Sequence, residues 1–159
     1  MADSIEFSLL GVDSLLNKFA SISDDVKRKG GRSSLRKAAN LVAAKLKENA
    51  RGLDDPDSGQ SIADNVAVRW NGRLFKRTGD LGFRVGILGG AVLDKEGGKE
   101  AGSPTPHWRL LEFGTEKMRA VPFARRALAD NISEATSTFL REYEKAIDRA
   151  IKRAAKGNN

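Results

Sequence analysis

The chain has 159 residues, with 28 Lys and Arg against 21 Asp and Glu, and a formal net charge of +7. This length supports a single domain over residues 1–159 with a hydrophobic core of its own. The absence of cysteine excludes disulfides, thiolate metal sites and a cysteine nucleophile. No apolar run approaches the roughly 20 residues of a membrane-spanning helix, so we expect no membrane partner.

The first 22 residues predict one strand and one short helix. Apolar and polar residues alternate over residues 4–10 (SIEFSLL), which is the period of a half-buried strand. Over residues 12–22 the apolar positions recur at intervals of three and four, which favours an amphipathic helix. We expect this strand to join the sheet that the middle of the chain predicts.

The following segment predicts a long basic helix over residues 24–50, with apolar residues at helical spacing. We expect it to continue through Gly30 and Gly31, with a weak spot there because each glycine costs about 1 kcal/mol relative to alanine. Residues 27–51 hold nine basic side chains and one acid, Glu48, a local excess of +8. Such a surface can meet solvent, an acidic protein or a nucleic-acid backbone, and we favour the first two. The candidate residues are Lys27, Arg28, Arg32, Arg36, Lys37, Lys45, Lys47 and Arg51.

The middle of the chain predicts a small sheet. Residues 66–70 alternate as one strand, and Asn71-Gly72 is a strong signal for a two-residue hairpin turn. We therefore predict a return strand over residues 73–77 and a third strand over residues 81–88. With the N-terminal strand, these give a mostly antiparallel sheet.

Two glycine-rich stretches on either side of this sheet predict loops. Residues 52–61 and 89–106 show no helical or strand periodicity and are rich in turn-forming residues. We expect both loops to be flexible in the free protein.

The stretch HWRLLEFGTEKMRAVPFARRAL predicts a short helix, a tight break and a second helix. Trp108 and Leu111, with Phe113 less regularly placed, fall on one side of the short helix. Gly114 can end that helix with a positive φ, and Pro122 can open the next one. This stretch therefore predicts a joint between the sheet and the C-terminal part of the chain.

Four residues of this joint carry further predictions. Trp108, Phe113 and Phe123 are expected to be core residues, each stabilising the fold by about 1.5 to 3 kcal/mol when buried. Glu112 is an acid inside this apolar cluster, and a buried carboxylate needs a partner. We therefore predict an ion pair or backbone hydrogen bonds for Glu112. The candidate cations are Arg109, Arg119 and Arg125.

Residues 122–156 predict one final helix of about 35 residues. This helix is longer than the sheet can cover, so part of its apolar stripe, which includes Leu128 and Ile132, must pack on the basic helix, on a neighbouring subunit or on nothing. The predicted fold class is α+β: a small, mostly antiparallel sheet packed against a basic amphipathic helix and a long C-terminal helix.

No catalytic, metal-binding or cofactor-binding pattern emerges. His107 is the one histidine, and no G-x-S-x-G elbow supplies a serine for it to activate. Asp54, Asp55 and Asp57 lack the later glutamate of an EF-hand loop, and the sequence GGKE at Gly97 lacks the spacing of a phosphate-binding loop. We therefore expect no metal and no cofactor, and predict that the chain is not an enzyme.

The joint resembles the tail-component family of lambdoid long-tailed phages, typified by product ten of the HK-type phages and similar to minor tail protein Z. In that family an aromatic-x-x-φ-Glu-Phe-Gly-Thr segment precedes a basic connector and an Ala-x-Pro-Phe that opens a long helix. The matching residues here are Trp108, Leu111, Glu112, Phe113, Gly114, Thr115, Pro122 and Phe123. Two positions depart from the pattern: Ser58 replaces a Thr, and Arg126 replaces a frequent Pro, which favours a continuous final helix.

The resemblance implies a virion structural protein of the phage neck that joins the head to the tail. It implies a ring around the DNA channel, with six copies as the expected number, assembled in the host cytoplasm. The implied partners are further copies of the chain, a head-closure protein, a tail terminator or tail tube, and transiently the DNA. The alternative is a small basic nucleic-acid-binding protein that uses the helix over residues 27–51.

Overall fold

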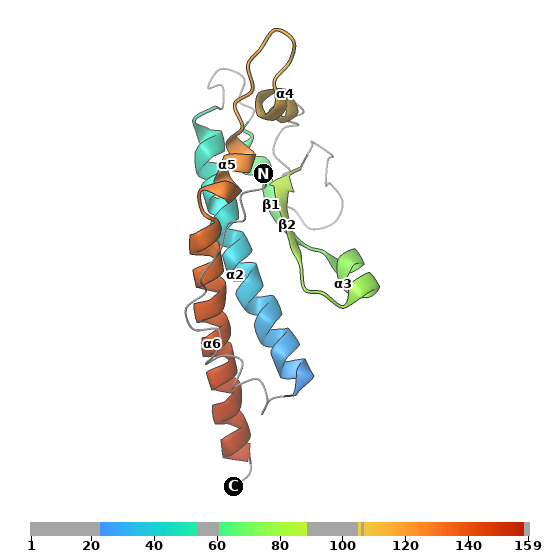
Figure 1. Cartoon of the computed structure of the whole chain (residues 1–159), viewed down its shortest axis with the longest axis vertical. Helices are drawn as coiled ribbons and strands as arrows, with labels where there is room; N and C mark the ends of the chain where they lie inside the picture. The colour runs from blue at the N-terminus through green and yellow to red at the C-terminus, as the bar shows by residue number, and fades with distance from the viewer. Residues whose placement is uncertain (1–22, 54–60, 89–104, 106, 158–159) are drawn as a thin grey trace, which may run out of the picture.

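The computed structural model describes residues 23–53, 61–88, 105 and 107–157 (Figure 1). The predicted N-terminal strand and helix and most of both predicted loops lie outside these residues. Within them the chain is α+β, as predicted. The elements in chain order are α2 (Asp24–Arg51), η1 (Ala63–Asn65), β1 (Val66–Trp70), α3 (Gly72–Thr78), β2 (Phe83–Ile87), α4 (Trp108–Phe113), α5 (Phe123–Ala129) and α6 (Ile132–Gly157).

The fold is built on α2 and α6, two long helices that lie side by side and run in opposite directions (Figure 1). The predicted basic helix is confirmed, and it is continuous through Gly30. A Cβ at Gly30 would lie 3.3 Å from the Cβ of Ala146, so this glycine lets the helices approach closely. Nearby, the Tyr143 hydroxyl donates a hydrogen bond to the Lys27 carbonyl at 2.9 Å. The glycine is therefore a packing site where the sequence had predicted only a weak spot.

The described sheet has two antiparallel strands, β1 and β2, with Val66 opposite Ile87 and Trp70 opposite Phe83. Both strands were predicted. The inner faces of the two strands turn toward α2, which covers them. The sheet therefore runs along α2, with Val66 packed against the C-terminal half of this helix and Trp70 beside Arg32 in its N-terminal half.

The predicted return strand over residues 73–77 is wrong, because α3 occupies this position. Asn71 caps α3: its side-chain oxygen accepts a hydrogen bond from the Leu74 amide at 3.1 Å. Phe75 packs on Trp70 with ring centroids 5.6 Å apart, and Gly79 ends the helix with φ of 78°. An Asn-Gly pair favours either a tight turn or a helix start, and here the packing of Phe75 on Trp70 supports the helix.

The prediction of one continuous final helix over residues 122–156 is also wrong. The chain breaks between α5 and α6 at Asp130 and Asn131. The Asn131 side-chain amide donates to the Ala127 carbonyl at 3.0 Å, and its backbone amide donates to the Leu128 carbonyl at 3.1 Å. A short polar side chain that bonds the preceding turn in this way competes with helical hydrogen bonds. The break falls five residues beyond Arg126, the position that had favoured continuity.

The core lies where α2 meets the other elements. Its larger cluster joins the C-terminal half of α2 to η1, β1 and α5, and a smaller cluster joins the middle of α2 to α6. Part of the C-terminal stripe therefore packs on the basic helix, which is one of the three alternatives that the sequence left open. No helix in the described ranges is both long and apolar enough to cross a membrane. The larger cluster consists of Ala43, Leu46, Ala50, Ile62, Ala63, Val66, Phe123 and Ala127.

Candidate assembly interface

The joint between α4 and α5 folds back tightly on itself. Gly114 ends α4 with φ of 75° and ψ of −179°, as its position predicted. A Cβ at this residue would lie 2.8 Å from both the Ala120 nitrogen and the Met118 oxygen. Beyond the turn, the Val121 amide donates to the Leu111 carbonyl at 2.7 Å. The connector over residues 114–122 therefore returns the chain to α4 before α5 starts.

Glu112 fastens the two sides of this joint. Its side chain is 2% exposed and accepts hydrogen bonds from the backbone amides of Ala124 at 2.8 Å and Arg125 at 3.1 Å. The Arg125 guanidinium completes the site, with Nε 2.9 Å from the Glu112 carboxylate and Nη2 2.9 Å from the Glu112 carbonyl oxygen. The predicted partnership of Glu112 is confirmed, with Arg125 as the cation. α5 begins after Pro122, as predicted.

The aromatic residues of the joint divide between core and surface. Phe123 is 4% exposed in the core, and Trp108 packs half-buried against the same cluster beside Leu111. Phe113 is 64% exposed, so its prediction as a core residue is wrong. It follows Leu111 by two positions, which is about 200° around a helix, and therefore points away from the packed side of α4. Arg125 covers part of its ring, with the guanidinium carbon 5.4 Å from the centroid.

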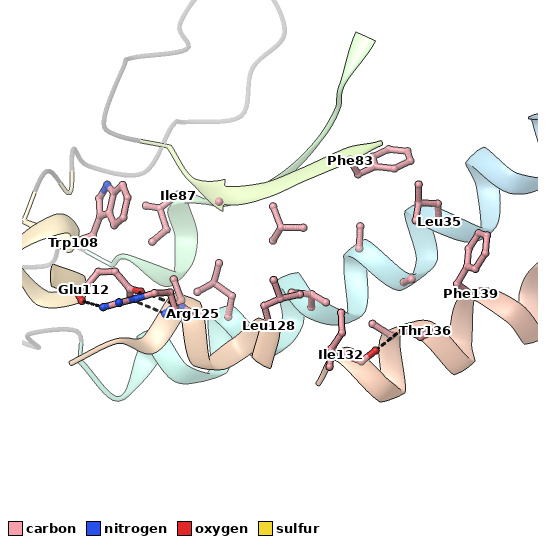
Figure 2. A pocket seen from close by; sticks show the side chains of 18 of the residues that line it. Leu35, Phe83, Ile87, Trp108, Glu112, Arg125, Leu128, Ile132, Thr136 and Phe139 are labelled. Atoms are coloured by element: carbon pink, nitrogen blue, oxygen red, sulfur yellow. Dashed lines mark hydrogen bonds and ion pairs between the residues drawn. The ribbon is translucent and has the colours of Figure 1, made fainter. Parts of the chain in front are cut away.

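An apolar groove of about 630 Å³ lies between β2, α2 and the α5–α6 segment (Figure 2). The Glu112–Arg125 pair and Trp108 lie at one end of the groove, and Phe139 lies toward the other. The groove is also lined by the polar side chain of Thr136, whose hydroxyl donates a hydrogen bond to the Ile132 carbonyl at 2.8 Å. The groove therefore presents a mostly apolar surface, in which the Glu112, Arg125 and Thr136 side chains are each hydrogen-bonded. Its apolar lining residues include Leu35, Ala38, Val42, Leu46, Phe83, Val85, Ile87, Trp108, Phe113, Leu128, Ile132 and Phe139.

Several large apolar side chains in and around this groove are open to solvent. Leu128 on α5 and Ile132 on α6 line it and are 50% and 39% exposed. A second exposed apolar set lies outside the groove, on α4 and the connector. We call this set the connector patch; it consists of Leu110, Met118 and Val121.

The sequence pattern identified Leu128 and Ile132 as members of the final helix's apolar stripe but could not show that they are exposed. The break at Asn131 places them on two different helices, Leu128 on α5 and Ile132 on α6. The connector patch gave no periodic signal, because two of its three residues lie outside any helix.

The candidate basic surface on α2 is divided among several environments. Lys37 pairs with Glu142 on α6, and Lys27 and Lys45 pair within α2 with Asp24 and Glu48. Arg32 lies over the Trp70 ring. The remaining candidates are exposed, and none of them forms an ion pair with another described residue. They are Arg28, Arg36, Lys47 and Arg51.

In the described part of the chain, no three His, Cys, Asp or Glu side chains are placed to share a metal ion. His107 stands just before α4, where its carbonyl accepts from Leu110 and Leu111. The acids Asp54, Asp55 and Asp57 lie outside the described residues.

A comparison with protein-family models matches residues 13–114 to the family described as "Bacteriophage HK97-gp10, putative tail-component". The match covers well over half of the chain. The chain belongs to this family of phage tail components. The matched region runs through α2, the sheet and α4 and ends at Gly114, so the α5–α6 segment lies beyond it.

Membership of this family makes the chain a tail component of the virion that contacts other phage structural proteins. The resemblance noted from the sequence is confirmed at this level. Comparisons with curated proteins and with solved structures gave no significant match.

Proposed function

We propose that the chain is a non-enzymatic structural protein of the phage neck that joins the head to the tail as a closed ring around the DNA channel. The expected number of copies is six. The expected neighbours above and below are a head-closure protein and a tail terminator or tail tube. The observation that carries the ring is the presence of two separate apolar surfaces on one chain, the groove and the connector patch.

Two different exposed apolar surfaces on one subunit favour a head-to-tail arrangement of the subunits. A symmetric dimer buries the same patch on both subunits, whereas a ring needs one patch of each subunit to meet a different patch of the next. The groove is concave and apolar, and the connector patch is built on α4 and the tight connector. We expect the connector patch of one copy to lie in the groove of the next, which would remove both from water.

The Glu112–Arg125 pair supports this arrangement by holding both surfaces in place. It fixes the end of α4, which carries Leu110, to the first turn of α5, which carries Leu128. The docking surfaces are therefore rigidly related within one copy. A fixed angle between them is what closes a ring at a defined number of subunits.

The test is the mass of the assembly in native mass spectrometry or light scattering. Leu128→Glu places a charge in the groove at a half-exposed position, so the fold should persist while subunit association weakens. The matched control is Ser133→Glu, which adds the same charge at an exposed position of α6 that does not line the groove. Monomers for Leu128→Glu and rings for wild type and Ser133→Glu are expected. Rings of unchanged mass for Leu128→Glu would contradict the groove as the interface.

The position in the virion has its own test. Phage particles made without this protein should accumulate as DNA-filled heads and separate tails. Restoring the wild-type protein should join them, and the Leu128→Glu variant should not. Infectious particles in the absence of the protein would contradict a role in joining head to tail.

A further inference from the structure

The hairpin formed by β1, α3 and β2 carries an exposed group of cations at its tip, with α3 projecting away from the two long helices (Figure 1). The one acid between Val66 and Ile87 is Asp80, which accepts a hydrogen bond from the Thr78 hydroxyl at 2.7 Å. None of the cations forms an ion pair with a described residue. We call them the tip cations; they are Arg69, Arg73, Lys76, Arg77 and Arg84.

Two tip cations lie where their charges destabilise the sheet. Arg69 and Arg84 are directly opposite each other in the β1–β2 register, both exposed on the outer side of the sheet. Like charges at such a cross-strand position repel and destabilise the pair of strands. An anion bound over the two guanidinium groups would relieve that repulsion and gain two charge-assisted hydrogen-bond donors.

A second group of cations lies beside the tip on α2. Lys29, Arg32 and Arg36 follow one another at helical spacing and line a hollow of about 390 Å³ together with Trp70 and Phe83. The Arg32 guanidinium carbon lies 4.3 Å from the Trp70 ring centroid, which holds this side chain between the helix and the sheet. The hollow lies on the side of the sheet that faces α2, opposite to Arg69 and Arg84, so it raises the positive charge at this end of the molecule without being continuous with that pair.

We propose that the tip cations form a surface that binds the phosphate backbone of duplex DNA without reading its sequence. An acidic protein is the competing partner for any cationic surface, but a protein interface normally has an apolar centre. The large apolar side chains exposed among the described residues lie on α4, the connector, α5 and α6. The hairpin and α2 carry none of them, so this surface offers charge alone, which is what backbone recognition uses.

The aromatic residues near the surface argue for a duplex over a single strand. Single-strand binding relies on free aromatic faces that stack on bases. Trp70 is engaged by Arg32 and by the rings of Phe75 and Phe83, whose centroids lie 5.6 and 5.2 Å from its own. The contact is therefore electrostatic and sequence-independent. It concerns a single copy and does not depend on ring assembly.

The experiment measures the binding of a fluorescently labelled 20-base-pair duplex by anisotropy across a salt series. The variant is Arg69→Thr/Arg84→Thr, because threonine suits an exposed strand position. Each lost phosphate contact should reduce the slope of log K against log salt by about 1, so a reduction of about 2 is expected. Urea unfolding should show equal or greater stability, because the cross-strand repulsion is removed.

The matched control is Lys152→Ser/Arg153→Ser, which removes the same two charges from exposed positions of α6. The control should keep the wild-type salt slope. An equal fall in slope for both double variants would overturn the proposal, since binding would then follow net charge alone. Wild-type binding to poly-glutamate but not to the duplex at 50 mM salt would assign the surface to an acidic protein. A preference of more than tenfold between unrelated duplexes would overturn backbone-only recognition.

Discussion

Glu112 illustrates how one buried carboxylate can hold a joint together. It accepts two backbone amides from the first turn of α5 and one guanidinium nitrogen, so each oxygen is used. Glu112→Gln should lower the free energy of unfolding by about 2 kcal/mol, because the amide places a donor against a donor and loses the ion pair. Urea denaturation measures this loss.

Glu116→Gln is the control for that substitution. Glu116 is exposed on the connector and forms no ion pair with a described residue, so its change should stay within about 0.5 kcal/mol. Equal losses of unfolding free energy in the two variants would show that the hydrogen bonds and ion pair of Glu112 do not stabilise the joint.

Alanine substitutions at Gly114 and Gly79 compare a crowded glycine of positive φ with an uncrowded one. Both have φ near 75°, but nothing lies within 4 Å of a Cβ at Gly79, whereas two backbone atoms lie 2.8 Å from one at Gly114. Gly79→Ala should cost about 1 kcal/mol, the ordinary cost of a left-handed residue. Gly114→Ala should cost more than about 2 kcal/mol, since its ψ of −179° gives a backbone conformation that is essentially confined to glycine and the connector must also move.

Thermal and urea unfolding of these two alanine variants give the comparison. Equal costs would show that the close approach of the connector does not matter.

Single residues were predictable where their chemistry was unusual for their setting. Glu112 stood out because an acid in an apolar cluster must find partners, and Gly114 because a helix ended there. Phe113 was not predictable, because its hydrophobicity is equally compatible with a core and with a docking surface. Its exposure depends on which side of α4 meets the sheet, and that contact is set by Trp108 and Leu111.

The α2–α6 pair should respond to acid through Glu142. Lys37 from α2 and Lys145 from α6 both bond this carboxylate, and they lower its pKa from 4.5 to about 2. Between these values the unfolded chain binds a proton that the folded chain does not, so the unfolding free energy falls as pH drops from 4.5 to 2. Glu142→Gln should show a smaller fall over this range in pH-dependent urea unfolding.

Glu134→Gln serves as the control on the same helix, since Glu134 is exposed and forms no ion pair with a described residue. It should keep the wild-type pH dependence. If both variants behave alike, the acid response comes from elsewhere in the chain.

Long periodic elements were predictable, and short connections were not. α2, β1 and β2 followed from their apolar periods, which extend over several residues each. α3 was missed because Asn71-Gly72 suits two local structures, and packing of Phe75 on Trp70 selects one of them. The break before α6 was missed because the apolar stripe continues across Asn131, whose side chain bonds the preceding turn instead of pointing to solvent.

At the scale of the whole molecule, apolar and cationic surfaces occupy different parts of the chain. The groove lies between α5–α6 and the facing sides of α2 and β2, and the connector patch lies on α4 and the connector, while the tip cations are exposed on the hairpin. If assembly buries the groove, the midpoint of thermal unfolding should rise with protein concentration, because association stabilises the folded state by mass action.

The concentration series should be run on wild type, Leu128→Glu and Ser133→Glu by differential scanning fluorimetry with an extrinsic dye. Wild type and Ser133→Glu should show the rise, and Leu128→Glu should not. A wild-type midpoint independent of concentration would argue against assembly through the groove.

The two tryptophans of the chain lie at opposite ends of β2: Trp70 is paired with Phe83 at its start, and Trp108 lines the groove with Ile87 at its end. The molecule thus carries one intrinsic optical reporter on each of its two surfaces. With Trp108→Phe the remaining emission comes from beneath Arg32, and with Trp70→Phe it comes from the groove. Engagement of either surface can therefore be followed in the same protein without attaching a label to it.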